Sequence, residues 1–115
     1  MYYIEKTIEI SACHHLVLDY ESKCTQTHGH NWIITICCRS KELDKNGMVT
    51  DFTLAKERIM KVIDHKTLND VLPFNPTAEN IARWCTEQIP HCYKATVRES
   101  ADNIATYVVD SIDED

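Results

Sequence analysis

Two stretches of alternating apolar and polar residues, 2–16 and 30–39, constrain the fold of this chain more than any other feature. Alternate side chains of an extended strand point to the same face, so each stretch predicts a long strand with one inward face. The inward face of the first strand holds Ile4, Lys6, Ile8, Ile10, Ala12, His14 and Leu16. That of the second strand holds His30, Trp32, Ile34, Ile36 and Cys38. Each predicted strand therefore carries an imidazole among apolar side chains.

The segment between these strands, Cys24-Thr25-Gln26-Thr27-His28-Gly29-His30, places two imidazoles two residues apart behind a cysteine. On a strand, His28 and His30 share a face and can converge on one ion, with His14 as a third ligand. Three imidazoles with a fourth position open to water or substrate are typical of catalytic zinc, so we predict Zn2+ here. Two alternatives stay open. The His-x-His pair can be an exposed strand feature, or Cys24 can close a structural His₃Cys site.

The composition predicts one soluble domain that spans residues 1–115, with 43% hydrophobic residues to form its core. A net charge of −6 argues against a nucleic-acid-binding surface. Residues 110–115 carry four carboxylates and no basic residue, and we expect this acidic tail to be frayed and solvated.

Cysteine usage and hydropathy indicate a cytoplasmic protein. The six cysteines include no Cys-x-x-Cys pair and lie mostly in apolar runs, as reduced core cysteines do. The chain shows no secretory leader and no apolar run near the roughly 18 residues that a membrane span needs. We expect neither export nor a membrane partner.

Two helices are expected between two pairs of strands. Asp51 can cap the first helix, which ends near Asp64-His65 and whose inward stripe is Phe52, Ala55, Ile59, Val62 and Ile63. Thr77 can cap the second helix, which Pro90 stops and whose inward stripe is Ile81, Trp84, Cys85 and Gln88.

Residues 93–99 and 103–109 alternate again and predict two further strands. The resulting order ββααββ predicts an α+β fold, an antiparallel four-stranded sheet with two helices on one face. Such a sheet leaves its other face and both edges uncovered. Self-association into a closed barrel would bury them, so we expect an oligomer.

Two carboxylates occupy positions where chemistry is plausible. Asp64 precedes His65 and can orient its imidazole and raise its basicity, although an Asp-His pair at a helix end is, taken alone, more often a solvated terminus. Glu99 lies on the face that also carries Tyr93, Ala95 and Val97. A ligand with paired N–H donors would match its carboxylate, and the alternative is an ion pair with a neighbouring Arg or Lys.

Cys24 is a candidate for nucleophile or base. Lys23 beside it and a nearby metal cation would both favour its thiolate form. The alternative is an inert, half-buried thiol.

These residues resemble a known family, the 6-pyruvoyltetrahydropterin and 6-carboxytetrahydropterin synthases, over nearly the whole chain. The resemblance rests on Ser11-Ala12-Cys13-His14-His15-Leu16, Cys24 with His28-Gly29-His30, Gly47-Met48-Val49-Thr50-Asp51-Phe52, Asp64-His65-Lys66-Thr67-Leu68-Asn69, Asn75-Pro76-Thr77-Ala78-Glu79 and Arg98-Glu99. The three-residue gap between Cys24 and His28 is similar to the bacterial 6-carboxytetrahydropterin synthases of queuosine biosynthesis. The family's usual Arg after the first zinc histidine is His15 here.

This resemblance implies a tunnelling fold, a homohexamer and a zinc enzyme. Its substrate would be dihydroneopterin triphosphate, and its products 6-carboxytetrahydropterin, acetaldehyde and triphosphate. Cys24 would be the general base, Asp64 and His65 a paired proton relay, and Glu99 the anchor for the pterin's guanidine-like edge. Two rivals remain, a pyruvoyl-type synthase with the same ligands and a non-catalytic, zinc-stabilised assembly module.

Overall fold

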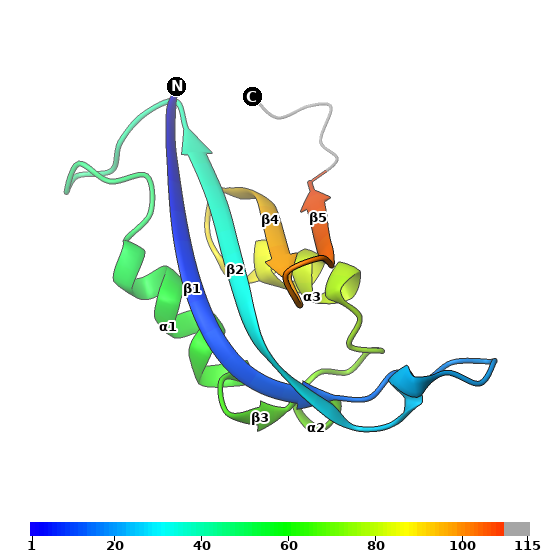
Figure 1. Ribbon diagram of the computed structural model, residues 1–115. Coiled ribbons are helices and arrows are strands. Elements are labelled where there is room, and N and C mark those ends of the chain that lie inside the picture. Colours follow the sequence, from blue (N-terminus) through cyan, green and yellow to red (C-terminus); the bar gives the residue numbers. More distant parts are fainter. Residues whose placement is uncertain (110–115) are drawn as a thin grey trace.

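A computed structural model describes residues 1–109 of the chain, and the acidic tail predicted at residues 110–115 lies outside the described residues (Figure 1). The elements follow one another as β1 (Tyr2–His14), the 3-10 helix η1 (Lys23–Thr25), β2 (His28–Ser40), α1 (Phe52–Ile63), β3 (Lys66–Thr67), α2 (Leu68–Val71), α3 (Ala78–Gln88), β4 (Cys92–Arg98) and β5 (Ile104–Val108). The predicted ββααββ order is therefore confirmed for the six long elements.

One sheet in the order β3-β1-β2-β4-β5 forms the centre of the fold. The long strands are antiparallel, and β1 pairs with β2 along its whole length, from Tyr2 opposite Ser40 to His14 opposite His28. The predicted four-stranded sheet needs one correction, because the two-residue strand β3 adds a fifth strand, parallel to β1. Neither β3 nor the single-turn helix α2 is long enough to show a periodic pattern in the sequence.

Helices α1 and α3 lie on the same side of the sheet, α1 against β1 and α3 against β4 and β5 (Figure 1). The core between the two layers includes Ile10, Trp32, Ile34, Ile59 and Ile81, all at most 2% exposed. The predicted inward faces of β1 and β2 are thus confirmed. Because the side chains alternate, the odd-numbered positions of both strands point to the face that the helices leave uncovered.

The helix caps are as predicted, and the inward stripes need correction. Asp51 accepts a hydrogen bond from Thr53 N at 2.8 Å, and Thr77 accepts one from Asn80 N at 3.1 Å. Phe52, predicted to point inward, is 46% exposed because it occupies the first position of α1, at the rim of the core. Val62 is half-buried.

In α3 the buried stripe is rotated by one residue from the prediction. Ile81 and Cys85 are buried as predicted, but Ala82 and Thr86 complete the inner face. Trp84 and Gln88 are only half-buried. A small residue and a short hydroxyl here let the helix approach the sheet more closely than the bulky side chains would.

Strand β1 ends at His14, two residues earlier than predicted, because side chains rather than a neighbouring strand form the hydrogen bonds to the backbone groups beyond it. Asn69 accepts from His15 N at 2.9 Å and donates to His15 O at 2.9 Å. Asn75 does the same for Val17, at 2.9 Å and 3.1 Å. The chain thereby leaves the sheet just past the histidine.

All six cysteines are free thiols, of which Cys37, Cys38 and Cys85 are buried and the other three half-buried. Within the described residues, no helix combines the length and the apolar character that crossing a membrane requires.

Candidate metal centre

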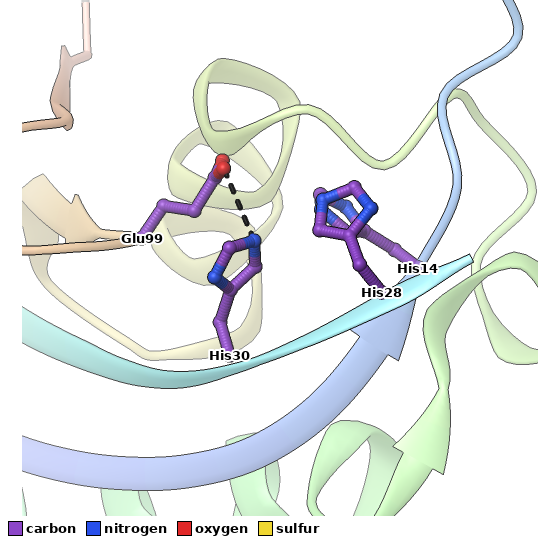
Figure 2. A group of neighbouring side chains, drawn as sticks. All are labelled: His14, His28, His30 and Glu99. Atoms are coloured by element: carbon purple, nitrogen blue, oxygen red, sulfur yellow. Dashed lines mark hydrogen bonds and ion pairs between the residues drawn. The ribbon is translucent and has the colours of Figure 1, made fainter. Parts of the chain in front are cut away.

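Three histidines converge at the end of the β1–β2 ladder, on the face that the helices cover (Figure 2). Register places His28 opposite His14 and His30 opposite Ala12. The ring centroids of His14 lie 4.6 Å from His28 and 5.4 Å from His30, and those of His28 and His30 are 4.8 Å apart. His14 rather than His15 points inward, as the alternation along the strand predicts.

Backbone carbonyls orient two of these rings. His14 Nδ1 lies 2.8 Å from Pro76 O, and His28 Nδ1 lies 2.7 Å from Gln26 O. A carbonyl oxygen only accepts, so each Nδ1 must carry the hydrogen and each Nε2 is left with its lone pair. The two Nε2 atoms are 3.1 Å apart. This second layer of hydrogen bonds is what metal-binding histidines usually have.

His30 presents its Nε2 to the same point. That atom is buried, and in the described part of the chain it makes no hydrogen bond. A buried polar atom without a partner carries a free-energy cost unless something else binds it. A metal ion among the three Nε2 atoms would meet that requirement.

Burial keeps the imidazoles in the form that binds metals. Desolvation lowers the pKa of His14, and the neighbouring His28 lowers it further, against a hydrogen bond to Pro76 that raises it. Desolvation also lowers the pKa of His30, although the Glu99 carboxylate opposes the shift. Both rings are therefore neutral at neutral pH, and only a neutral imidazole has a lone pair for a metal.

Glu99 is the fourth member of the group. It follows β4, on the face that carries the buried Ala95 and Val97, and its Oε2 lies 3.2 Å from His30 Nε2 (Figure 2). The ligand atoms of the three histidines and Glu99 all lie within 4.8 Å of one another, so the group could hold a metal ion. The predicted alternative, an ion pair with Arg or Lys, is not what the structure has, since the described partner of Glu99 is His30.

Cys24 lies in η1, half-buried. Its carbonyl accepts from Leu16 N at 2.7 Å, which ties η1 to the chain just beyond β1. Its thiol does not belong to the ligand group found in the described residues, whose fourth member is Glu99. The structural His₃Cys alternative therefore gains no support from the geometry.

Asp64 and His65 contact each other, and neither belongs to the group of possible metal ligands. Asp64 Oδ2 lies 3.6 Å from His65 Nε2, and its Oδ1 accepts from Ser11 N at 3.0 Å. The His65 side chain is 80% exposed and lines a cavity of about 490 Å³ with Ser11, Cys13, Gly29 and Asn31, and Ala12 and His30 also border this cavity. The side chains of the odd-numbered residues in this lining point away from the face of His14 and His28. Within one chain, the predicted proton relay therefore lies outside the ligand group of the described residues.

The groups that orient the ligands were not predicted from the sequence. The carbonyls of Pro76 and Gln26 fix two rings, and Asn69 and Asn75 fix the chain beyond His14. The only signal in the sequence was that Asn69, Asn75 and Pro76 stand in the motifs that carried the family resemblance.

Comparison with known proteins gives the family of the chain. A family model described as 6-pyruvoyl tetrahydropterin synthase matches residues 3–110. The chain belongs to this family. Among the family's curated members, 6-carboxy-5,6,7,8-tetrahydropterin synthase of Bacillus subtilis is 26% identical over 121 residues, which cover 90% of this chain and 83% of that protein. The enzyme of the same name from Rickettsia conorii is 30% identical over 112 residues, covering 93% and 77%.

A solved structure of the same family gives the fold independently. The 6-pyruvoyl tetrahydropterin synthase of Caenorhabditis elegans superimposes with a TM-score of 0.76 at 27% identity, and the match covers 95% of this chain and 96% of that one. The predicted resemblance to the tetrahydropterin synthases and the predicted tunnelling fold are both confirmed.

Proposed function

We propose that this chain is a zinc-dependent 6-carboxytetrahydropterin synthase of queuosine biosynthesis, a cytoplasmic lyase. It would convert dihydroneopterin triphosphate to 6-carboxytetrahydropterin, acetaldehyde and triphosphate. The observation that carries the proposal is the convergence of three imidazoles, two of them oriented by backbone carbonyls, with ligand atoms within 4.8 Å of one another. Its support from comparison is the name shared by the Bacillus and Rickettsia relatives.

The residues have separate tasks in this reaction. His14, His28 and His30 would hold Zn2+, which when bound acts as a Lewis acid toward the side-chain hydroxyls of the substrate. The Cys24 thiolate would accept a proton from the substrate side chain. Glu99 would accept N–H hydrogen bonds from the guanidine-like edge of the pterin.

Asp64 and His65 would serve as the proton relay at a site shared between subunits. Within one chain they lie outside the ligand group, and a neighbouring chain would bring them to the substrate. We propose a homohexamer in which the uncovered sheet faces and edges close into barrels.

A pyruvoyl-type synthase is the second candidate, favoured by the structural match to the Caenorhabditis elegans enzyme of that name. The same ligands would serve both reactions, and the products differ. A non-catalytic, zinc-stabilised module is the third candidate. It would bind metal and turn nothing over.

One assay separates the three candidates. Zinc-loaded protein is incubated with dihydroneopterin triphosphate and the pterin product is identified by mass spectrometry, with His14→Ala as the control. We expect 6-carboxytetrahydropterin from the wild type, and loss of both product and zinc in the variant. A pyruvoyl product would support the second candidate. A zinc-bound protein without product would support the third.

A further inference from the structure

Two of the distances between ligand atoms at the histidine cluster match the edges of a tetrahedral zinc site. Zinc–ligand bonds of 2.0–2.1 Å place neighbouring ligand atoms about 3.3 Å apart in a tetrahedron. The His14 and His28 Nε2 atoms are 3.1 Å apart, and His30 Nε2 is 3.2 Å from Glu99 Oε2. Two separate edges of the group thus match, and one of them includes the carboxylate.

The backbone brings Glu99 to this position. Glu99 N donates to Asn103 O at 3.0 Å, which closes the turn after β4. The side chain of the preceding Arg98 turns the other way and donates to Ala101 O at 3.0 Å, so it does not compete for the carboxylate. Glu99 is therefore aimed at the histidines and free of other cations in the described part of the chain.

The contact between Glu99 and His30 is not satisfied by a hydrogen bond. His30 Nε2 is buried and unpartnered although a carboxylate oxygen lies 3.2 Å away. When that nitrogen holds the lone pair that metal binding requires, both atoms are acceptors and repel each other. A cation bound by both removes the repulsion.

We propose that Glu99 is the fourth metal ligand of the substrate-free enzyme and that the substrate's hydroxyls displace it. This inference rests on the proposed function, since it gives a second role to the residue assigned to the pterin edge. Once displaced, the carboxylate is free to accept the N–H donors of the ring, so binding of the hydroxyls and binding of the ring are coupled. Both side chains are about one-fifth exposed, which leaves room for the exchange.

The exchange has a consequence for selectivity. Substrate and product both include a triphosphate, an anionic oxygen ligand that an open zinc position would bind. A carboxylate already on the metal repels anions, whereas a neutral pair of hydroxyls can replace it while the carboxylate gains the ring as a new partner. Glu99 would thus keep the metal from binding phosphate.

The test uses the cobalt-substituted protein, whose visible absorption reports on the metal's ligands. Wild type, Glu99→Gln and the control Glu57→Gln, which removes an exposed carboxylate on α1, are titrated with sodium azide. Zinc affinity is measured by competition with a chelator. We expect azide to bind Glu99→Gln at least about 10-fold more tightly than the other two, and zinc affinity to fall by about 10-fold or more, since even an outer partner of a ligand is worth that much.

Equal azide binding and equal zinc affinity in Glu99→Gln and wild type would overturn the inference. So would sulfur-to-cobalt charge-transfer absorption in the wild type, because it would place Cys24 in the fourth position. These failures differ from failure of the proposed function. A wild type that binds zinc and forms the pterin product, with Glu99→Gln unchanged toward azide, refutes only the ligand exchange. A wild type that binds no metal refutes both.

Discussion

At the scale of single residues, burial and backbone hydrogen bonds prepare the histidines for a metal ion. Burial disfavours the charged form of His14 and His30, and carbonyl acceptors hold the ring hydrogens of His14 and His28 on Nδ1. The two effects act together, because a neutral ring in the wrong tautomer presents a hydrogen instead of a lone pair. The same arrangement destabilises the metal-free protein below pH 6.5, where the unfolded chain gains protons that the folded one does not.

Cys24 is the residue for which the competing roles make opposite forecasts. If Cys24 is a general base outside the ligand group, the Cys24→Ala variant keeps the three histidines and Glu99. We expect near-stoichiometric zinc by elemental analysis and a fall in turnover of roughly 10²–10⁴. Cys13→Ala, a half-buried thiol on the opposite sheet face, is the matched control and should retain zinc. Loss of zinc in parallel with activity in Cys24→Ala would make Cys24 a ligand.

At the scale of elements, the segment after β1 depends on one side chain. Asn69 makes two hydrogen bonds to the backbone of His15 and a third, at 3.3 Å, to its ring. Asn69→Ala leaves both backbone groups without a protein partner, so we expect the free energy of unfolding to fall by about 1–3 kcal/mol. Chemical denaturation measures it, with the exposed turn variant Asn46→Ala as control. An unchanged midpoint in Asn69→Ala would show that water replaces these bonds at no cost.

The elements also show which structural features can be predicted from the sequence. Alternation and helix caps are local, so the two long strands, the cap Asp51 and the inward direction of His14 were predicted correctly. Strand β3 and the distance between Glu99 and His30 depend on contacts between segments far apart in the chain. No pattern within one segment encodes them, and Phe52 was misplaced because its helical spacing says nothing of where the core ends.

At the scale of the whole molecule, the fold separates groups that the proposed reaction needs together. The metal group lies on the helix-covered face, and His65 lines a cavity on the opposite side of β1 and β2. A flexible hinge does not resolve this, because β1 and β2 are paired along all of β1. The proposed association of chains would bring His65 to the metal centre of a neighbouring chain, and a monomer in sedimentation at micromolar concentration would contradict it.

Mixed oligomers test this sharing directly. Cys24→Ala and His65→Ala are each expected to be nearly inactive, since each lacks one half of the proton-transfer machinery. In oligomers that contain both variants, a site that takes Cys24 from one chain and His65 from another is intact when each chain supplies its unmutated residue. Random 1:1 assembly makes about one quarter of the sites intact, because each of two independent positions is correct half of the time. We therefore expect co-expressed, doubly tagged hetero-oligomers to recover about one quarter of wild-type turnover. Oligomers of either variant alone, carried through the same purification, should recover none. If Cys24 and His65 of the same chain form a site, every site in the mixed oligomer lacks one residue, and activity stays at the level of the single variants.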